Sequence, residues 1–289
     1  MKILILQNRM GIGDMIMFLP FIEAISKKFK TPVTILAKKN TKVEMYFNNK
    51  EIVEEIMYLE REDNKKHSGV KGFFKLINEL KLKKFDKVFI FNSSLRYFLI
   101  SKFSGIKEVF HYPLFKKKNQ QIIEAAKEFT LKSIGEDIES TPRLFLKEQD
   151  ILKAKKDHSI DQSITNIILG IGGSGKTKRV PASIFKSFMS KVLKRSNCRF
   201  FLMTGNNIDE LKIMDEIIES EYKEYCTPLN NFTIKEILPI IPNCQIAICN
   251  DSSFSHLSAG LGIKTIVLMV DTPLISVSYT HLTLPTNGL

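Results

Sequence analysis

Short apolar runs rich in β-branched residues alternate with longer amphipathic segments along most of this chain. Runs of this kind are typical of strands buried on both faces of a parallel sheet. Because parallel strands need a crossover between them, usually a helix, the alternation predicts βαβ units. We expect strands at 2–7, 32–38, 86–92, 108–112, 166–172, 199–205, 245–251 and 264–269, and helices at 14–29, 70–82, 119–134, 182–195, 207–220, 233–241 and 253–261.

The alternation is interrupted between residues 136 and 165, where EDIESTPR and KAKKDHSIDQS show no clear succession of strand and helix. We therefore expect two Rossmann-like α/β domains with parallel sheets, at residues 1–150 and 160–276. The length of 289 residues suits two such domains or one large one.

The end of the chain departs from this pattern, because VSYTHLTLPTNGL predicts neither a helix nor a strand that continues the second domain. Within it, SYTHLTLPT resembles the translation of a transposon-end sequencing adapter. On that interpretation residues 277–289 are a non-native tail, and the second domain is C-terminally truncated. The alternative is an ordinary polar tail.

The chain is basic, with 43 lysines and arginines against 31 acids and a net charge of +12. A basic surface favours anionic partners such as nucleic acid, an acidic membrane face or phosphorylated substrates. The alternative is a lysine-rich protein with solvated helix faces. The four cysteines form no CxxC pair and have no histidine at ligand spacing, so the sequence predicts no metal site and no disulfide framework.

The N-terminal apolar run ends at Gln7 and is too short for a signal peptide. No stretch approaches the ~18 uncharged residues of a membrane span. We expect a cytoplasmic protein whose membrane contact, if any, is peripheral and at the inner face of the inner membrane. Segment 71–87 mixes lysines with phenylalanine and leucine, which suits either a helix lying on a membrane or an ordinary surface helix with one core stripe.

The sequence GIGD, residues 11–14, follows the first predicted strand. Gly11 and Gly13 would let the backbone turn tightly and approach a ligand. A dinucleotide fingerprint is excluded because its third glycine position holds Ile16. Asp14 is either a plain helix cap or a carboxylate facing the ligand crevice, where it could accept a proton from a sugar hydroxyl.

Residues 170–177, GIGGSGKT, match the phosphate-loop pattern of nucleotide hydrolases and kinases. Such a loop runs directly into a long helix, whereas Pro181 falls inside the first turns of that helix. The alternative is a loop that ends at Pro181, after which a new helix starts. In that case the glycines and Ser174 line a phosphate site, and Lys178, with Arg179 or Lys176, supplies positive charge.

Two further strand ends carry candidate binding residues. Asp251 and the serines after it precede a predicted helix whose N–H groups would suit a diphosphate, and His256 lies in its first turns. His256 is either a phosphate contact or a half-buried structural histidine. In MTGNNIDE, Asp209 and Glu210 either complement a helix dipole or accept ribose hydroxyls.

Taken together, these stretches resemble glycosyltransferase family 9, the ADP-heptose:lipopolysaccharide heptosyltransferases. The resemblance rests on GIGDMIMFLPFIEAI, on K-x-V-P where the family usually has K-x-W-P, on the strand–Gly–acid element, and on NDSSFSHLSAGLGIKTIVLM where the family has D-T-G-x-x-H. It extends from residue 2 to about 270. The chain departs from the family pattern at Val180, which replaces Trp, and at Ser253, which replaces Gly.

The resemblance implies a GT-B architecture, with an acceptor on the N-terminal domain and a nucleotide sugar on the C-terminal one. It implies inverting, metal-independent transfer of a sugar, heptose from ADP-heptose, to a lipopolysaccharide core or similar anionic glycolipid. Asp14 falls on the general base and Lys178 on the phosphate-binding lysine. The ribose-binding acid falls on Asp209 or Glu210. The donor-phosphate element falls on Asp251, Ser252, Ser253 and His256.

Because the nucleotide sugar is a substrate, no cofactor is expected, and no nucleic-acid partner. The alternatives are a phosphate-loop NTPase or kinase that uses GIGGSGKT, and a non-catalytic nucleotide-sugar binding protein.

Overall fold

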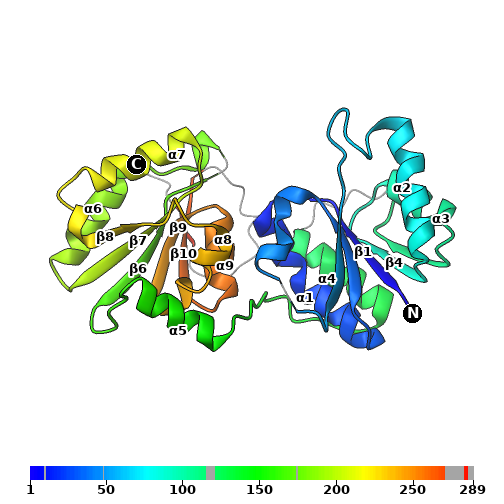
Figure 1. The fold of residues 1–289 in the computed structure, drawn as a ribbon, viewed down its shortest axis with the longest axis horizontal. Coiled ribbons are helices and arrows are strands. Elements are labelled where there is room, and N and C mark those ends of the chain that lie inside the picture. Colours follow the sequence, from blue (N-terminus) through cyan, green and yellow to red (C-terminus); the bar gives the residue numbers. More distant parts are fainter. Residues whose placement is uncertain (10, 48, 115–120, 174, 271–282, 286–289) are drawn as a thin grey trace. The chain divides into compact units, whose positions relative to one another are not determined.

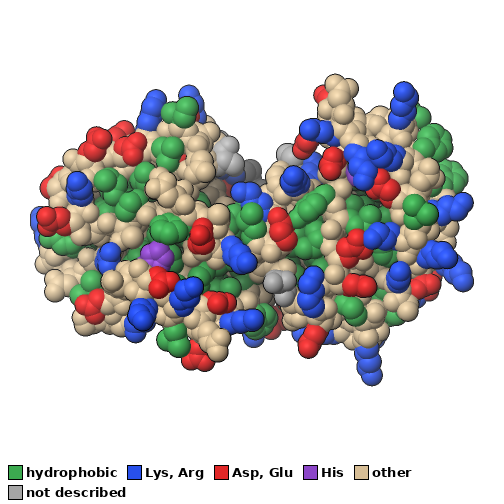
Figure 2. All heavy atoms as spheres, viewed as in Figure 1, with side chains coloured by type: hydrophobic (Ala, Val, Ile, Leu, Met, Phe, Trp, Pro, Cys, Tyr) green, Lys and Arg blue, Asp and Glu red, His purple; other side chains and the backbone are tan. Residues whose placement is uncertain are grey.

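The computed structural model describes residues 1–289 except 10, 48, 115–120, 174, 271–282 and 286–289. The chain divides into two compact units, Met1–Pro142 and Arg143–Leu289, each built on its own sheet (Figure 1). Lysine and arginine side chains are spread over both units on the face shown in Figure 2. No helix in the described part of the chain combines the length and apolarity that a membrane span requires.

The first unit contains a five-stranded sheet in the order β3-β2-β1-β4-β5, with every neighbouring pair parallel. Its strands are β1 Ile3–Gln7, β2 Val33–Ala37, β3 Val53–Tyr58, β4 Lys87–Ile90 and β5 Glu108–His111. Strands β1 and β2 are buried at every residue, because helices cover both faces of the sheet.

The helices of this unit are α1 Ile12–Phe29, α2 Gly69–Lys83, α3 Leu95–Phe103 and α4 Ile122–Ile134. Alternate residues of a strand point to opposite faces. Val88 and Ile90 of β4 pack in the cluster that contains α2 and α3, whereas Phe89 meets Phe29 of α1. Helices α1 and α4 therefore cover one face, and α2 and α3 the other, as Figure 1 shows.

The second unit contains a six-stranded parallel sheet in the order β11-β10-β9-β6-β7-β8. Its strands are β6 Thr165–Gly170, β7 Cys198–Met203, β8 Cys226–Pro228, β9 Ile246–Asn250, β10 Lys264–Met269 and β11 Thr283–Pro285. The helices are α5 Glu148–Asp157, α6 Ala182–Leu193, α7 Ile208–Ile218, α8 Ile234–Ile237 and α9 Ser253–Gly260. Helices α6 and α7 pack together over one core cluster.

The predicted fold class, α/β with two parallel sheets, is confirmed. Several elements were missed, because their sequences lack the apolar periodicity that identifies buried elements. Strand β3 carries two glutamates on an edge, β8 has three residues, and α5 buries only Ala154. Helix α3, which was also missed, has apolar residues all round.

Two expected elements differ from those observed. The helix expected at 233–241 ends at Ile237, two residues before Pro239, because proline has no N–H to continue the helical hydrogen bonds. The expectation that no strand lies in the last residues was wrong for Thr283–Pro285, which pairs parallel with β10. An open sheet edge offers unpaired backbone groups to any extended segment that reaches it. The prediction that residues 277–289 are non-native stays a prediction.

Each sheet has a point where the strand order reverses. In the first unit it lies between β1 and β4, because β2 and β3 extend the sheet on one side of β1 and β4 and β5 on the other. In the second unit it lies between β6 and β9. In such sheets, ligands bind outside the carboxyl ends of the strands at this switch point.

We expect Phe185→Ala to lower the free energy of unfolding of the second unit by about 3–5 kcal/mol, because the ring is 1% exposed within its core. The neighbouring residue Ile184 is 39% exposed on the same helix, so Ile184→Ala is a matched control that should change stability by less than about 1 kcal/mol. Urea denaturation followed by circular dichroism measures both. Equal effects of the two substitutions would contradict the assigned core face of α6.

Candidate functional site

The switch point of the first unit is lined by polar side chains from the loops after β1 and β4. The Asn92 amide donates a hydrogen bond to the Asn8 side-chain oxygen over 2.6 Å, which ties the two loops together. The Asn92 side-chain oxygen also accepts the Ser94 N–H at 2.8 Å, so both polar atoms of the Asn92 amide are hydrogen-bonded. These asparagines were not identified from the sequence, although Asn8 directly follows β1 and Asn92 lies two residues after β4.

Asp14 lies beside this switch point, in the first turn of α1. The helix begins at Ile12, and Gly11 precedes it with a φ of 103°, a conformation that L side chains rarely adopt. Asp14 is therefore inside the helix, and its interpretation as the N-cap was wrong. Its carboxylate forms an ion pair with Arg9 at 3.4 Å and is about one-quarter exposed. Gly13 lies in the same turn and is partly exposed.

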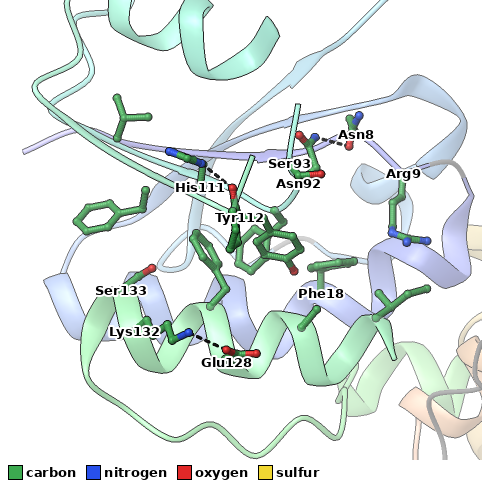
Figure 3. A pocket seen from close by; sticks show the side chains of 17 residues that line it. Asn8, Arg9, Phe18, Asn92, Ser93, His111, Tyr112, Glu128, Lys132 and Ser133 are labelled. Carbon is green, nitrogen blue, oxygen red and sulfur yellow. Dashed lines mark hydrogen bonds and ion pairs between the residues drawn. The ribbon is translucent and has the colours of Figure 1, made fainter. Parts of the chain in front are cut away.

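A cavity of about 1080 Å³ opens next to this loop, between the ends of β1, β4 and β5 and helix α4 (Figure 3). Asn8, Arg9, Asn92 and Ser93 form its polar end. The volume is comparable to that of small-molecule sites, which are mostly apolar with a few placed polar groups. Arg9 both lines the cavity and pairs with Asp14, so the cavity and the carboxylate are linked through one side chain.

Aromatic side chains line much of the rest of the cavity. Phe91 packs edge to face with Phe18 at 5.2 Å and with Phe129 at 5.0 Å between ring centroids, and Phe129 also meets Tyr112. The Tyr112 hydroxyl is buried and finds no hydrogen-bond partner among the described residues. Burial raises the pKa of Tyr112, which Arg9 partly opposes, so the phenol stays protonated and can donate to a ligand.

The second switch point brings together two residues predicted for the donor site. Lys178 lies in the 3₁₀ turn Lys176–Lys178 after β6, and Asp251 directly follows β9. The lysine ammonium and the aspartate carboxylate form an ion pair at 2.8 Å. They are 73 positions apart in the chain, and the adjacency of β6 and β9 brings them together.

Asn250, the last residue of β9, holds the loop that carries Lys178. Its side-chain oxygen accepts the Val180 N–H at 3.3 Å, and its amide donates to the Ile171 carbonyl at 2.9 Å. The side chain is fully buried, so both bonds lie in a low-dielectric environment. Sequence reasoning missed this residue. A polar residue at the end of an otherwise apolar strand was the available signal.

The structure excludes the phosphate-loop geometry for GIGGSGKT. Helix α6 begins at Ala182, with Pro181 as its N-cap, and not at the Lys-Thr pair. Lys176 is exposed, in a short 3₁₀ turn that ends before extended backbone at Arg179. A phosphate loop needs a helix that starts directly behind it. The expectation of a new helix after Pro181 is confirmed, and Ser174 lies outside the described residues.

Glu210 and Asp209 occupy different environments at the start of α7. The buried Glu210 carboxylate accepts the N–H of Gly205 at 2.7 Å and that of Gly173 at 3.2 Å. A Cβ at Gly172 or Gly205 would come within 3 Å of this carboxylate, which explains glycine at both positions. Glu210 therefore fixes the loops after β6 and β7 to each other.

Asp209 is more accessible than Glu210 and pairs with Arg179 at 3.3 Å. The Arg179 side chain is itself nearly buried and also reaches the Asn207 side chain at 3.5 Å. Asn207 caps α7 by accepting the Asp209 N–H. Of the two predicted ribose-binding acids, Asp209 is thus the one with an exposed carboxylate, whereas Glu210 is occupied by backbone donors.

Helix α9 starts beside the Lys178–Asp251 pair. Ser252 is its N-cap residue, but its hydroxyl makes no capping bond and has no hydrogen-bond partner among the described residues, although it is buried. Ser253 is the first residue of the helix. The N–H groups of a first helical turn lack partners within the helix and favour an anion. The predicted elements after β6 and β9 therefore lie together, and the donor site proposed from the sequence stays a prediction.

His256 lies in the same helix and is partly buried. Burial lowers the pKa of His256 to about 4; Asp251 opposes this shift and Lys178 adds to it. The imidazole is therefore neutral near pH 7 and acts as a hydrogen-bonding group rather than a cation.

The lowered pKa of His256 predicts a loss of stability in acid. The unfolded state, with a histidine pKa of about 6.5, binds the proton more readily than the folded state. The free energy of unfolding is therefore undiminished above pH 6.5 and falls as the pH drops toward about 4. Between pH 7 and pH 5 the free energy of unfolding of the wild type should fall by about 2 kcal/mol more than that of His256→Gln. Urea denaturation at the two pH values measures this, and parallel pH profiles would contradict it.

The family model described as glycosyltransferase family 9 (heptosyltransferase) matches residues 73–285. Among curated protein sequences, none matches the chain significantly. The fold is similar to that of ADP-heptose lipopolysaccharide heptosyltransferase II from Escherichia coli, with a TM-score of 0.69 and 18% identity over 93% of this chain and 84% of that one.

Two further solved structures share the fold. The glycosyl transferase family 9 protein from Veillonella parvula has a TM-score of 0.74 and 17% identity, over 95% of this chain and 83% of its own. The E. coli heptosyltransferase WaaC, with ADP-2-deoxy-2-fluoro heptose, has a TM-score of 0.65 and 13% identity, over 98% and 92%. The family match covers well over half of the chain, which therefore belongs to glycosyltransferase family 9 and is a glycosyltransferase enzyme.

Proposed function

We propose that this glycosyltransferase moves heptose from ADP-heptose to a lipopolysaccharide core or similar anionic glycolipid, with inversion and without a metal ion. The proposal rests on the side chains found at the switch point of each sheet. A carboxylate, Asp14, stands at one, and a lysine beside an open helix N-terminus stands at the other. A family 9 heptosyltransferase structure with an ADP-heptose analogue supports the choice of donor.

The residues of the second unit suit a nucleoside diphosphate leaving group. Lys178 has three N–H donors, so it can hold Asp251 and a phosphate oxygen at once. The N–H groups at the start of α9 and the unoccupied Ser252 hydroxyl add donors that need no reorganisation when negative charge develops. Together these groups would supply the charge stabilisation that a metal ion provides in other transferases. Asp209 is the accessible acid for the ribose hydroxyls.

Asp14 suits the role of general base for the acceptor hydroxyl. Arg9 orients its carboxylate, and the same arginine lines the cavity of the first unit. The asparagines at the polar end of that cavity can bind sugar hydroxyls, and the aromatic walls can cover apolar faces of the ring. In-line attack by the hydroxyl oxygen on the anomeric carbon forms the new glycosidic bond and expels the diphosphate, so the configuration inverts. The hydroxyl proton passes to Asp14.

A glycolipid acceptor implies that the enzyme works at a membrane surface. We therefore place it in the cytoplasm, in peripheral contact with the inner face of the inner membrane, as part of this proposal.

Asp14→Asn should lower turnover by ~10²-fold or more, with little change in donor affinity, because the amide cannot accept the proton. Transfer kinetics with ADP-heptose and a lipopolysaccharide-core acceptor measure turnover, and calorimetry measures donor binding. Glu23→Gln is the matched control, since Glu23 is a carboxylate on the same helix that pairs with Lys27. Undiminished turnover in a folded Asp14→Asn variant would exclude the assigned role.

ADP-heptose should raise the melting temperature of the protein equally with magnesium and with a chelator, because the binding groups belong to the chain. Lys178→Ala should weaken donor binding about tenfold to 100-fold, through loss of a charged hydrogen bond. Lys176→Ala is the matched control and should leave binding unchanged, because that lysine is exposed and turned to solvent. Magnesium-dependent stabilisation by ATP that Lys176→Ala abolishes would favour a nucleotide hydrolase instead.

A further inference from the structure

Helices α2 and α3 together expose five large apolar side chains. Val70 and Leu82 are 73% and 82% exposed, and Phe74 is 58% exposed, all on α2. Leu95 and Phe103 of α3 are exposed as well. We call the surface formed by these five residues the α2–α3 surface. Scattered single apolar residues need no explanation, but neighbouring ones on two packed helices do.

The exposed residues are distinct from the stripe of α2 that faces the core. Leu76, Ile77 and Leu80 are buried against the sheet and belong to the core cluster. An ordinary surface helix with one core stripe accounts for those three positions. It does not account for Phe74 and Leu82, which point away from that cluster into solvent.

Aromatic rings make the surface continuous between the two helices. Phe73 lies edge to face with Phe74 at 5.4 Å and with Phe103 at 6.4 Å between ring centroids. Arg96 of α3 stacks over the Phe73 ring and donates to the carbonyls of His67 and Gly69, just before and at the start of α2. Through Phe73 and Arg96, the two helices therefore present Phe74 and Phe103 on one continuous surface.

The charge on this surface is of one sign. The exposed face of α2 carries Lys71, Lys75 and Lys81, and α3 adds Lys102. Glu79 is the one acid in the sequence of α2, and it turns to Lys66 and the His67 ring at 2.8 and 3.1 Å. Helix α3 contains no acid. In Figure 2, green and blue side chains, with some red ones among them, lie over the part of the first unit that carries these helices.

We propose that the α2–α3 surface docks the enzyme on a bilayer with anionic headgroups. The apolar residues would enter the headgroup and acyl boundary, while the lysine ammonium groups reach the headgroups on flexible stems. Charge complementarity selects an anionic membrane over an uncharged one, because each lysine near such a surface contributes favourably. The inference rests on the proposed function only in that a glycolipid acceptor would bring the enzyme to a membrane. Its test does not depend on transfer activity.

Vesicle co-sedimentation of the full chain tests the proposal, with phosphatidylcholine vesicles that contain or lack phosphatidylglycerol. The wild type should bind the anionic vesicles preferentially, and binding should weaken with salt. Lys71→Gln, Lys75→Gln and Lys81→Gln combined should lower the partition coefficient on anionic vesicles about 100-fold. Phe74→Ser with Phe103→Ser should lower it about tenfold or more, because the inserted apolar area is lost.

Helix α5 of the second unit, together with Phe145 shortly before it, provides matched controls. Lys153→Gln, Lys155→Gln and Lys156→Gln remove the same net charge from another helix, and Leu152→Ser with Phe145→Ser removes two exposed apolar residues. These control variants should bind anionic vesicles within about threefold of the wild type. Circular dichroism checks that every variant is folded, which substitutions at exposed positions should permit.

Equal loss of binding in the α5 controls would overturn the proposal, because it would show general charge attraction. Absence of vesicle binding by the wild type would also overturn it, as would a self-associated wild type that Phe74→Ser with Phe103→Ser makes monomeric without affecting vesicles. Transfer to a soluble acceptor measures the proposed function separately. Vesicle binding without any transfer would refute that function and leave the docking surface standing.

Discussion

In a parallel sheet all strands end at the same edge, and both candidate sites of this enzyme depend on that constraint. The pairing of β6 with β9 brings Lys178 next to Asp251, and the pairing of β1 with β4 brings Asn8 next to Asn92. Each pair joins residues that are far apart along the chain. The strand order therefore decides which polar side chains come together, although these side chains are carried by the loops.

Several buried polar side chains in the candidate sites form hydrogen bonds to the backbone of neighbouring loops. These bonds hold the loops in place and are not available to a ligand. Glu210 and Asn250 are buried and use their side chains on backbone groups of neighbouring loops. Such contacts keep the loop of Lys178 in one conformation, so binding a donor would cost little ordering entropy. The hydroxyl of Ser252 is an exception, since it is buried beside these contacts without a partner among the described residues.

The first unit combines two surfaces of different chemistry. At the edge of its sheet lies a cavity with a polar end and aromatic walls, next to the ion pair of Asp14. On the face of the sheet covered by α2 and α3 lies an apolar and basic surface. Under the proposed function, the cavity would bind the acceptor sugar and the α2–α3 surface would contact the membrane.

The sequence by itself determined the α/β class, most of the strands, the family and the strand ends that carry the candidate site residues, because apolar period and strand-end polarity are local properties. It did not reveal β3, α3 or α5. It also did not reveal the hydrogen bonds by which the Asn250 and Glu210 side chains hold the backbone of neighbouring loops. It also left the phosphate-loop alternative open, which only the start of α6 at Ala182 excluded. The missed elements lack a clear apolar period, whereas the contacts of Asn250 and Glu210 depend on which distant segments meet, and strand order, a tertiary property, decides that.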